Sequence, residues 1–348
     1  MRLLLIFATS LCALLFAACG SDDSDSPSGA QPAAKQQEST EAGAFPVTIE
    51  HKYGSTTIKS EPKRVVVVGL RDQDALLALG VVPVATTEWF GKHPGAIFPW
   101  ATVALGNAPK PTVLTNTDGV QIEKVAAQRP DLIVGVYSGL TQKEYDALSK
   151  LAPVVAQPKD KVDYGSSWQE EQLTIGKAVG QPEKAQQLVD DTEKLIADTA
   201  AQHPEFKGKT AAEVTDYQGV FVYGPQDVRT QTLEALGFTY PQALADAFPD
   251  EFGGNLSEEK LDAIDVDALV WLADGDRSVE DLKSDPVYSK LNVRKEERDV
   301  FILADDRVYE ALSFPSVLSM PLLMKELGPR LAAAVDGDPS TSTDQQAG

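Results

Sequence analysis

Apolar residues fall along the chain in short runs that alternate with segments of helical spacing. The runs at residues 65–69 and 132–136 are continuous and rich in β-branched residues, which is typical of strands covered on both faces. Residues 74–79 and 122–128 have apolar positions three and four apart, which indicates helices. Strands and helices in alternation predict an α/β fold with a largely parallel sheet.

The second half of the chain repeats this alternation. Strands are predicted at residues 221–223, 268–272 and 300–303, and helices at residues 230–236, 257–264 and 316–327. Two α/β lobes are therefore expected.

A long helical pattern at residues 168–202 separates the lobes and is interrupted between Gly180 and Pro182. Glycine followed by proline suits one helix that ends and another that begins. The second helix, of about 18 residues, would span roughly 27 Å and could carry the chain once between the lobes. One apolar stripe at helical spacing consists of Ala185, Leu188, Val189, Thr192, Leu195, Ile196 and Thr199.

An internal repeat supports the two lobes. Residues 122–139 align without a gap on residues 258–275, at an offset of 136. Each copy reads as a helix, an acidic turn, a buried strand and a loop. Identical pairs include Glu123 and Glu259, Lys124 and Lys260, Ala127 and Ala263, Asp131 and Asp267, and Gly139 and Gly275.

The amino-terminal residues have the pattern of an export signal. Arg2 precedes a mostly apolar run that ends at residue 18 and is too short and interrupted to span a membrane comfortably. Small residues stand before Cys19, which resembles the lipobox where bacterial lipoproteins are lipidated and cleaved. A plain secretory signal is the alternative.

Polar, low-complexity composition marks residues 20–44 and 336–348, which cannot bury enough surface to offset their conformational entropy. The predicted organisation is a signal peptide at 1–18, a disordered tether at 19–44, an N-terminal lobe at 45–165, a connecting helix at 166–202, a C-terminal lobe at 203–335 and a disordered tail at 336–348.

Charge and cysteine content narrow the partners. The chain has 31 Lys and Arg against 52 Asp and Glu, so nucleic acid and anionic lipid surfaces are poor partners. An anionic ligand would have to be met locally by basic residues. Cleavage before Cys19 would leave a single cysteine and no intramolecular disulfide, so the fold must rely on its core.

The repeat and the connecting helix resemble the siderophore- and cobalamin-binding class of ABC-importer substrate-binding proteins over residues 45–335. The resemblance rests on the phrases at residues 122–134 and 256–261. It implies two Rossmann-like lobes joined by one long helix, the class III or chelatase-like fold, with ligand held between the lobes. It also implies that Glu123 and Glu259 dock on the permease. Alternatively, both are first-turn acids favoured by the helix dipole.

The cleft should be lined by loops at the carboxyl ends of the strands. Arginine can fork hydrogen bonds to chelate oxygens, and aromatic rings can cover apolar faces. Arg71 and Arg307 are the strongest candidates, because each follows a buried strand in a different lobe. Alternatively, each arginine pairs with its sequence neighbour, such as Asp72, Asp276 or Asp306. The candidate ligand-binding residues are Arg71, Trp89, Tyr137, Tyr223, Arg229, Arg277, Arg307 and Tyr309.

Other functions are less favoured. No dinucleotide fingerprint, phosphate loop or nucleophile elbow is present, so no catalytic residue is assigned. Haem or a corrinoid stays open as the ligand, since Tyr137, Tyr223 or Tyr309 could serve as an axial ligand. An envelope protein without a transport role is a further alternative. The scattered histidines, His93 among them, do not suggest a metal receptor.

We therefore expect a monomeric lipoprotein on the outer face of the bacterial cytoplasmic membrane. It would capture a ferric siderophore, whose iron arrives already chelated, and deliver it to an ABC permease. No cofactor and no nucleic-acid partner are expected.

Overall fold

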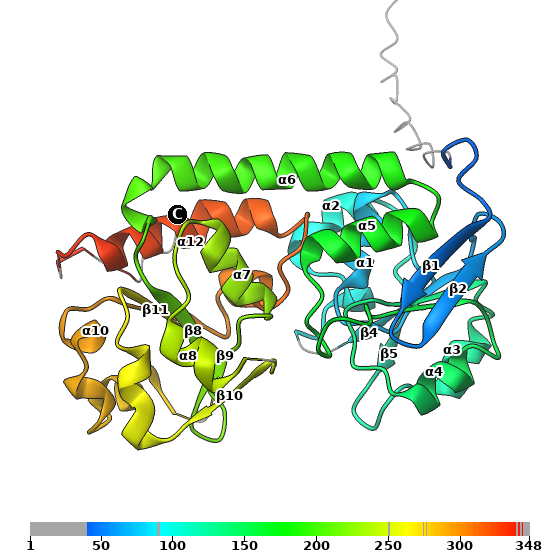
Figure 1. Cartoon of the computed structure of the whole chain (residues 1–348). Helices are drawn as coiled ribbons and strands as arrows, with labels where there is room; N and C mark the ends of the chain where they lie inside the picture. The colour runs from blue at the N-terminus through cyan, green and yellow to red at the C-terminus, as the bar shows by residue number, and fades with distance from the viewer. Residues whose placement is uncertain are drawn as a thin grey trace, which may run out of the picture. The chain divides into compact units, whose positions relative to one another are not determined.

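The computed structural model describes residues 40–88, 91–249, 251–273, 275, 277–338, 340, 341 and 343. The predicted signal, Cys19, most of the tether and Trp89 lie outside these residues. The described part contains two five-stranded sheets and a separate two-stranded hairpin. Figure 1 shows the two sheets in two lobes along the helix α6 (Pro182–Gln202). The α/β fold with two lobes is therefore confirmed.

The first lobe contains a parallel sheet with strand order β5-β4-β3-β6-β7. Its strands are β1 Val47–His51, β2 Gly54–Ile58, β3 Val65–Val67, β4 Ala85–Glu88, β5 Thr112–Thr115, β6 Leu132–Gly135 and β7 Val154–Ala156. Its helices are α1 Asp72–Ala78, η1 Pro94–Ala96, η2 Pro99–Ala101, α2 Thr102–Leu105, α3 Ile122–Ala127, α4 Gln142–Leu148 and α5 Trp168–Ala178.

The second lobe has the strand order β10-β9-β8-β11-β12, in which β9 is antiparallel to both neighbours. Its strands are β8 Ala211–Asp216, β9 Val220–Tyr223, β10 Gly253–Leu256, β11 Ala268–Ala273 and β12 Asp299–Leu303. Its helices are η3 Pro204–Phe206, α7 Val228–Ala235, α8 Gln242–Ala247, η4 Glu258–Ile264, α9 Val279–Ser284, η5 Tyr288–Lys290, α10 Asn292–Lys295, α11 Arg307–Ser313 and α12 Met320–Val335.

The internal repeat occupies equivalent places in the two sheets, because β6 and β11 each stand fourth in their strand order. The repeated aspartate has the same structural role in each lobe. Asp131 accepts a hydrogen bond of 2.8 Å from the backbone of Arg64, just before β3. Asp267 accepts one of 2.8 Å from the backbone of Thr210, just before β8. Each therefore ties its strand to the amino end of the central strand.

Each sheet is buried on both faces by apolar side chains. In β3, Val65 and Val67 pack into one hydrophobic cluster, while Val66 and, just after the strand, Val68 pack into the cluster on the other face. This alternation follows from the period of two along a strand. It explains why the strand reads as a continuous apolar run rather than an alternating one.

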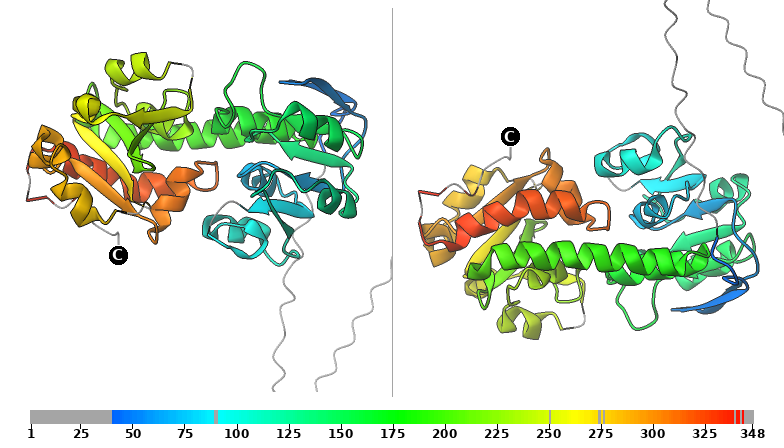
Figure 2. Two further views of the ribbon diagram at one scale, coloured as in Figure 1. Left: turned by 90° about the horizontal axis from the view of Figure 1, so that it is seen from below. Right: turned by 90° about the horizontal axis from the view of Figure 1, so that it is seen from above.

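The helix break at residues 180–182 lies where the glycine and proline predict it. Gly180 has φ of 74° after the end of α5, a left-handed conformation that favours glycine. Pro182 begins α6, where its missing N–H costs no helical hydrogen bond. Helix α6 packs against α5 at one end and α12 at the other, as Figure 2 shows.

Residues 40–44, the end of the predicted tether, lie within the described part, where Glu41 accepts a hydrogen bond of 2.9 Å from the backbone of Glu183. Unpaired N–H groups at the start of α6 explain this contact. The helix expected at residues 316–327 begins only at Met320, because Ser316 and Ser319 form a turn through their side chains.

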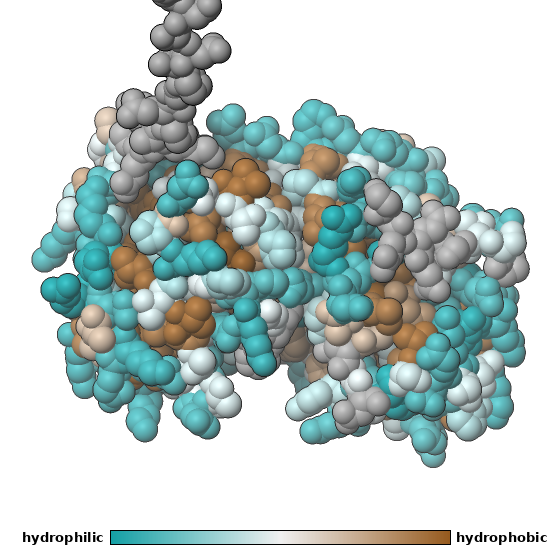
Figure 3. Space-filling model, turned by 180° about the vertical axis from the view of Figure 1, so that it is seen from behind, coloured by the Kyte–Doolittle hydropathy of each residue, from teal (hydrophilic) through white to brown (hydrophobic). Residues whose placement is uncertain are grey.

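The surface of the described part is largely hydrophilic on the face drawn in Figure 3, with hydrophobic residues in patches between the hydrophilic ones. Within the described residues, every helix is too short or too polar to cross a bilayer.

Candidate functional site

Aromatic side chains from both lobes meet at the carboxyl ends of the strands. Phe314, which follows α11, lies with its ring centroid 5.6 Å from Phe98 and 6.3 Å from Tyr137. The Phe252 centroid lies 6.4 Å from that of Tyr164. These residues form the inter-lobe aromatic cluster. The position agrees with the expectation that open α/β sheets bind ligands at this edge.

The first lobe presents a buried arginine cluster that we call the first arginine cluster: Arg71, Asp72, Tyr137 and Glu171. Arg71 is 1% exposed, and its Nε donates to Glu171 at 2.5 Å. The guanidinium carbon lies 3.8 Å from the Tyr137 ring centroid, which is cation–π geometry. Asp72 instead accepts hydrogen bonds from the backbone of Val136 and Tyr137. The alternative that Arg71 pairs with Asp72 is therefore wrong.

The second lobe presents an equivalent arrangement, the second arginine cluster: Glu213, Tyr223, Asp227 and Arg229. Arg229 donates through Nη1 to both carboxylate oxygens of Asp227, at 2.9 and 3.1 Å. Its Nε lies 3.7 Å from Glu213, and its guanidinium carbon lies 4.3 Å from the Tyr223 ring centroid. Both lobes therefore place one arginine against a tyrosine and a carboxyl group, with a second carboxyl group in the same cluster.

Burial dominates the electrostatics of these clusters. It raises the pKa of Glu171 and of Glu213 well above the ordinary range, because an ionised carboxylate is poorly solvated there. The nearby guanidinium of Arg71 or Arg229 opposes this increase without cancelling it. Burial also raises the pKa of Asp72, against hydrogen bonds from the backbone of Tyr137 and Val136 that lower it.

The other two predicted arginines lie in ion pairs of the second lobe. Arg277 bridges Asp216 at 2.9 Å and Asp285 at 3.2 Å. Arg307 opens α11 and pairs with the buried Glu326 through Nε at 3.0 Å. Asp306, the sequence neighbour that could have paired with Arg307, pairs with Arg330 instead. That pairing alternative is wrong for Arg307, and Asp276 lies outside the described residues.

Tyr309 is half-buried on α11, where it packs against the core of the second lobe. The expected loop at this place is therefore a helix from Arg307 onward. Trp89 has no described position. Tyr137 and Tyr223 lie with their arginines in the two clusters.

Polar side chains also join the two lobes, and the sequence did not predict these contacts. His93 Nε2 lies 2.7 Å from Glu310 Oε1. Asp74, wholly buried on α1, accepts hydrogen bonds of 2.6 Å from Ser316 across the lobes and from Trp100. Burial raises the pKa of Asp74 to about 6. Only His93 had been noticed, since a single aspartate or serine carries no local signal of such pairing.

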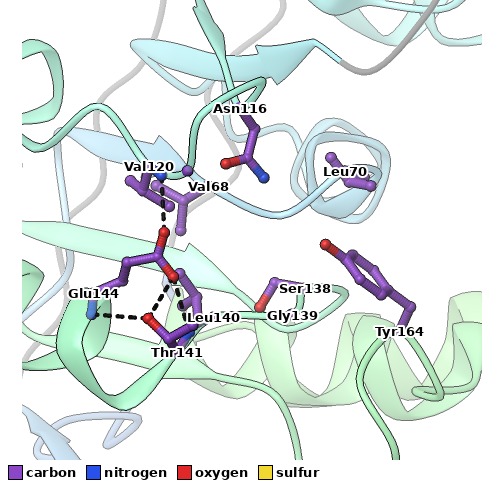
Figure 4. Close-up of a pocket in the computed structure, with 11 residues that line it drawn as sticks. Val68, Leu70, Asn116, Val120, Ser138, Gly139, Leu140, Thr141, Glu144 and Tyr164 are labelled. Atoms are coloured by element: carbon purple, nitrogen blue, oxygen red, sulfur yellow. Dashed lines mark hydrogen bonds between the residues drawn. The ribbon is translucent and has the colours of Figure 1, made fainter.

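A cavity of about 240 Å³ opens beside the aromatic cluster in the first lobe. Leu70 and Tyr164 line it and also pack with the aromatic residues. Figure 4 shows Glu144 in its wall, bonded to the backbone of Val120 and to Thr141. Those contacts occupy the carboxylate, so the cavity offers mainly hydroxyl, amide and apolar surface.

A second cavity, of about 300 Å³, lies in the corresponding place of the second lobe and contains Arg277. Val120 and Thr141 of the first cavity align with Leu256 and Arg277 of the second at the repeat offset of 136. The duplicated element thus produces a pocket in each lobe.

Glu123 and Glu259 are exposed at the second residue of α3 and of η4. Val120, three residues before Glu123, lines the first cavity, and Glu258, directly before Glu259, lines the second. The placement of Glu123 and Glu259 at the start of a helix fits both the docking role and the helix-dipole alternative. Across the described ranges no group of three His, Cys, Asp or Glu side chains is arranged to hold a metal ion.

The chain is similar to several curated proteins. It is 25% identical to the probable siderophore-binding lipoprotein YfiY of Bacillus subtilis, over 77% of this chain and 78% of that protein. It is 28% identical to the Fe(3+) dicitrate-binding periplasmic protein FecB of Escherichia coli, over 60% of this chain and 67% of that protein.

The chain is also similar to solved structures. A periplasmic solute-binding protein of Mycobacterium smegmatis is 34% identical with a TM-score of 0.72, covering 83% of this chain and 98% of that one. Streptococcus pneumoniae PiaA in complex with ferrichrome is 26% identical with a TM-score of 0.75, covering 84% and 99%. The model of the periplasmic binding protein family matches residues 65–306, and the chain therefore belongs to that family of non-enzymatic solute binders.

Proposed function

We propose that this chain is an extracytoplasmic lipoprotein that captures a ferric siderophore between its lobes and delivers it to an ABC importer. The observation that carries the proposal is the pair of arginine clusters, one from each lobe, beside aromatic rings contributed by both lobes. A bulky chelate needs apolar walls with a few directed donors, and this arrangement supplies both.

The similar proteins support the same ligand class. YfiY is named as a siderophore-binding lipoprotein, FecB as an Fe(3+) dicitrate-binding protein, and PiaA was solved with ferrichrome. The candidate contacts in this chain are Arg71, Tyr137, Tyr223 and Arg229, with Trp89, Arg277, Arg307 and Tyr309 as further candidates from the sequence. The iron would be cargo within its chelate.

Anchoring and docking complete the proposal. Cys19 would carry the lipid, and the polar segment after it would hold the lobes away from the membrane. A Cys19→Ala chain should fold and bind ligand but leave the membrane fraction. Retention of that variant on membranes at high salt would remove the lipoprotein assignment. Glu123 and Glu259 would each meet a basic residue of the permease.

A fluorescence titration tests ligand capture directly. Trp100 stacks on Phe98 with centroids 4.7 Å apart and donates to Asp74, so its emission should report ligand at the cleft. Ferric hydroxamate, catecholate and citrate chelates should be compared with haem and cobalamin on the soluble chain that follows Cys19. Saturable binding of a ferric chelate supports the proposal. Binding of haem or cobalamin alone would replace it with the second candidate ligand class.

A further inference from the structure

We propose that the ligand is a ferric chelate without net negative charge, of the tris-hydroxamate type, because the arginines at the cleft are already compensated by the chain's own carboxyl groups. This inference rests on the proposed function and narrows it to one charge class.

Carboxyl groups of the chain balance the charge of the arginine in each cluster. Arg71 has Glu171 at 2.5 Å from its Nε, and Asp72 is the adjacent residue. Arg229 has Asp227 at 2.9 Å and Glu213 at 3.7 Å. Each cluster therefore holds one guanidinium and two carboxyl groups. With one proton held by the glutamate a cluster is neutral, and with both carboxyls ionised it is negative, so neither cluster has positive charge to spare.

Protonation of the glutamates fits the geometry. Burial raises the pKa of Glu171 and Glu213, which favours the form in which each glutamate carries the proton. The hydrogen bond that links Glu171 to Asp72 has the same sense, because it raises the pKa of Glu171. Neutral clusters are the result that these contacts favour.

The remaining arginines at this edge of the sheets do not change the balance. Arg277 lies between Asp216 and Asp285, and Arg307 lies against Glu326. All four predicted arginines are thus matched by described carboxyl groups. An anionic chelate entering here would lose its hydration without gaining an unpaired cation, and uncompensated burial of charge is costly.

A neutral chelate can still be recognised. Within the described residues, Arg71 Nη1 is buried and donates no hydrogen bond to the protein. It could donate a single hydrogen bond to a neutral acceptor oxygen, such as that of a hydroxamate. Three hydroxamate anions balance Fe(III), whereas a tris-catecholate is a trianion and ferric citrate complexes are anionic. Aromatic rings from both lobes would cover the apolar faces of the chelate.

The test is a titration of the soluble chain with chelates of different charge. Ferrichrome is neutral, ferrioxamine B is cationic, and ferric enterobactin and ferric citrate are anionic. We expect the dissociation constant of ferrichrome or ferrioxamine B to be at least tenfold lower than that of either anion. The dissociation constant of the neutral ferrichrome should also change less than about twofold between low and high salt, since screening acts on charged pairs. Tighter binding of an anion would overturn the charge-class inference while leaving siderophore capture intact. Failure of every ferric chelate to bind would instead remove the proposed function.

A variant tests the mechanism of discrimination. Asp227→Asn keeps an N-cap oxygen for α7 and removes the carboxylate nearest Arg229. The affinity ratio of ferric enterobactin to ferrichrome should then rise by about tenfold. Asp131→Asn makes the same change at the amino ends of the strands of the first sheet, away from the cleft, and should leave the affinity ratio unchanged. An unchanged ratio in a folded Asp227→Asn protein would show that Asp227 does not compensate Arg229 toward the ligand.

Discussion

His93 Nε2 lies 2.7 Å from Oε1 of Glu310, a residue 217 positions away on the other lobe. His93 lies in the loop after β4, and Glu310 is on α11, three residues after Arg307. The side chains of His93 and Glu310 are 23% and 14% exposed, so the contact is largely shielded from solvent, although water can still reach it. Like the contact between Asp74 and Ser316, it is a polar link between the two lobes and should affect how firmly they hold together.

Replacing His93 with alanine should loosen the second lobe near the cleft. A half-buried pair of this kind contributes about 1 kcal/mol, which corresponds to roughly a fivefold change in a local opening equilibrium. Backbone amides of α11 should therefore exchange with deuterium about fivefold faster in His93→Ala, measured by mass spectrometry. Lys194→Ala, which breaks the exposed pair with Asp198 on α6, is the matched control. Equal exchange in both variants would show that the His93 contact does not hold α11.

Asp74 should make the stability of the protein depend on pH. Its folded pKa of about 6 lies above the ordinary value of 3.8, so the folded state binds this proton more tightly than the unfolded state. The resulting stability is present below pH of about 4 and is lost as pH rises through about 6. Asp74→Asn removes the titration. The free energy of unfolding of the variant, relative to wild type, should thus increase by about 3 kcal/mol between these limits.

Urea unfolding at a pH of about 4 and of about 7 measures this difference. Ser316→Ala provides a second check, because the Ser316 hydroxyl donates to Asp74 and lowers its pKa. Without that donor the folded pKa of Asp74 should be higher, so the loss of stability should extend to higher pH. A constant difference between Asp74→Asn and wild type would mean that Asp74 titrates at an ordinary value when folded.

Glu171 should tolerate glutamine far better than alanine. Glutamine keeps an oxygen for Arg71 Nε and offers an N–H to Asp72, as the protonated glutamate does. Alanine leaves the buried guanidinium without its nearest partner, which costs about 3 to 5 kcal/mol. Glu171→Gln should cost less than about 1 kcal/mol in chemical unfolding. Similar losses for both variants would show that Glu171 is ionised in the folded protein.

The fold could be predicted where strands are apolar on both faces. The strands β3, β6, β11 and β12 have this pattern, and the repeat correctly paired β6 with β11. Strand β8 was missed because Glu213 and Thr215 interrupt its apolar positions, although Glu213 is fully buried beside Arg229. Helix α11 was missed because its N-cap, Asp306, follows a second aspartate and reads as a loop.

The candidate site could be predicted only as far as topology determines it. Carboxyl ends of parallel strands meet at one edge, so the loops that carry Arg71 and Tyr137 were both expected at this edge. In the structure the Arg71 guanidinium carbon lies 3.8 Å from the Tyr137 ring centroid. The partner of Arg71 was not predictable, because Glu171 stands 100 residues away on α5. Local pairing rules point to the adjacent acid, but Asp72 instead accepts backbone hydrogen bonds at the end of β6.

The docking role of Glu123 and Glu259 can be tested by reversing their charge. Glu123 and Glu259 occupy the same position of the duplicated element, one in each lobe, and both are exposed. A permease that presents a basic residue to each lobe would use this pair for orientation. Exposed ion pairs contribute little affinity singly, but like charges brought together can cost several kcal/mol. The double variant Glu123→Lys with Glu259→Lys should therefore abolish uptake of the ferric chelate in cells.

Ligand affinity separates docking from damage to the cleft. Both glutamates lie outside the two arginine clusters, so the purified double variant should bind its chelate within about twofold of wild type. Lys124→Glu with Lys260→Glu is a matched control, because it reverses the neighbouring charges of the same repeat and should leave uptake near normal. Loss of uptake in the glutamate variant alone, with binding retained, would assign the pair to the permease interface. If uptake survives the reversal, both residues are ordinary acids at helix starts, stabilised by the helix dipole, and the docking role fails.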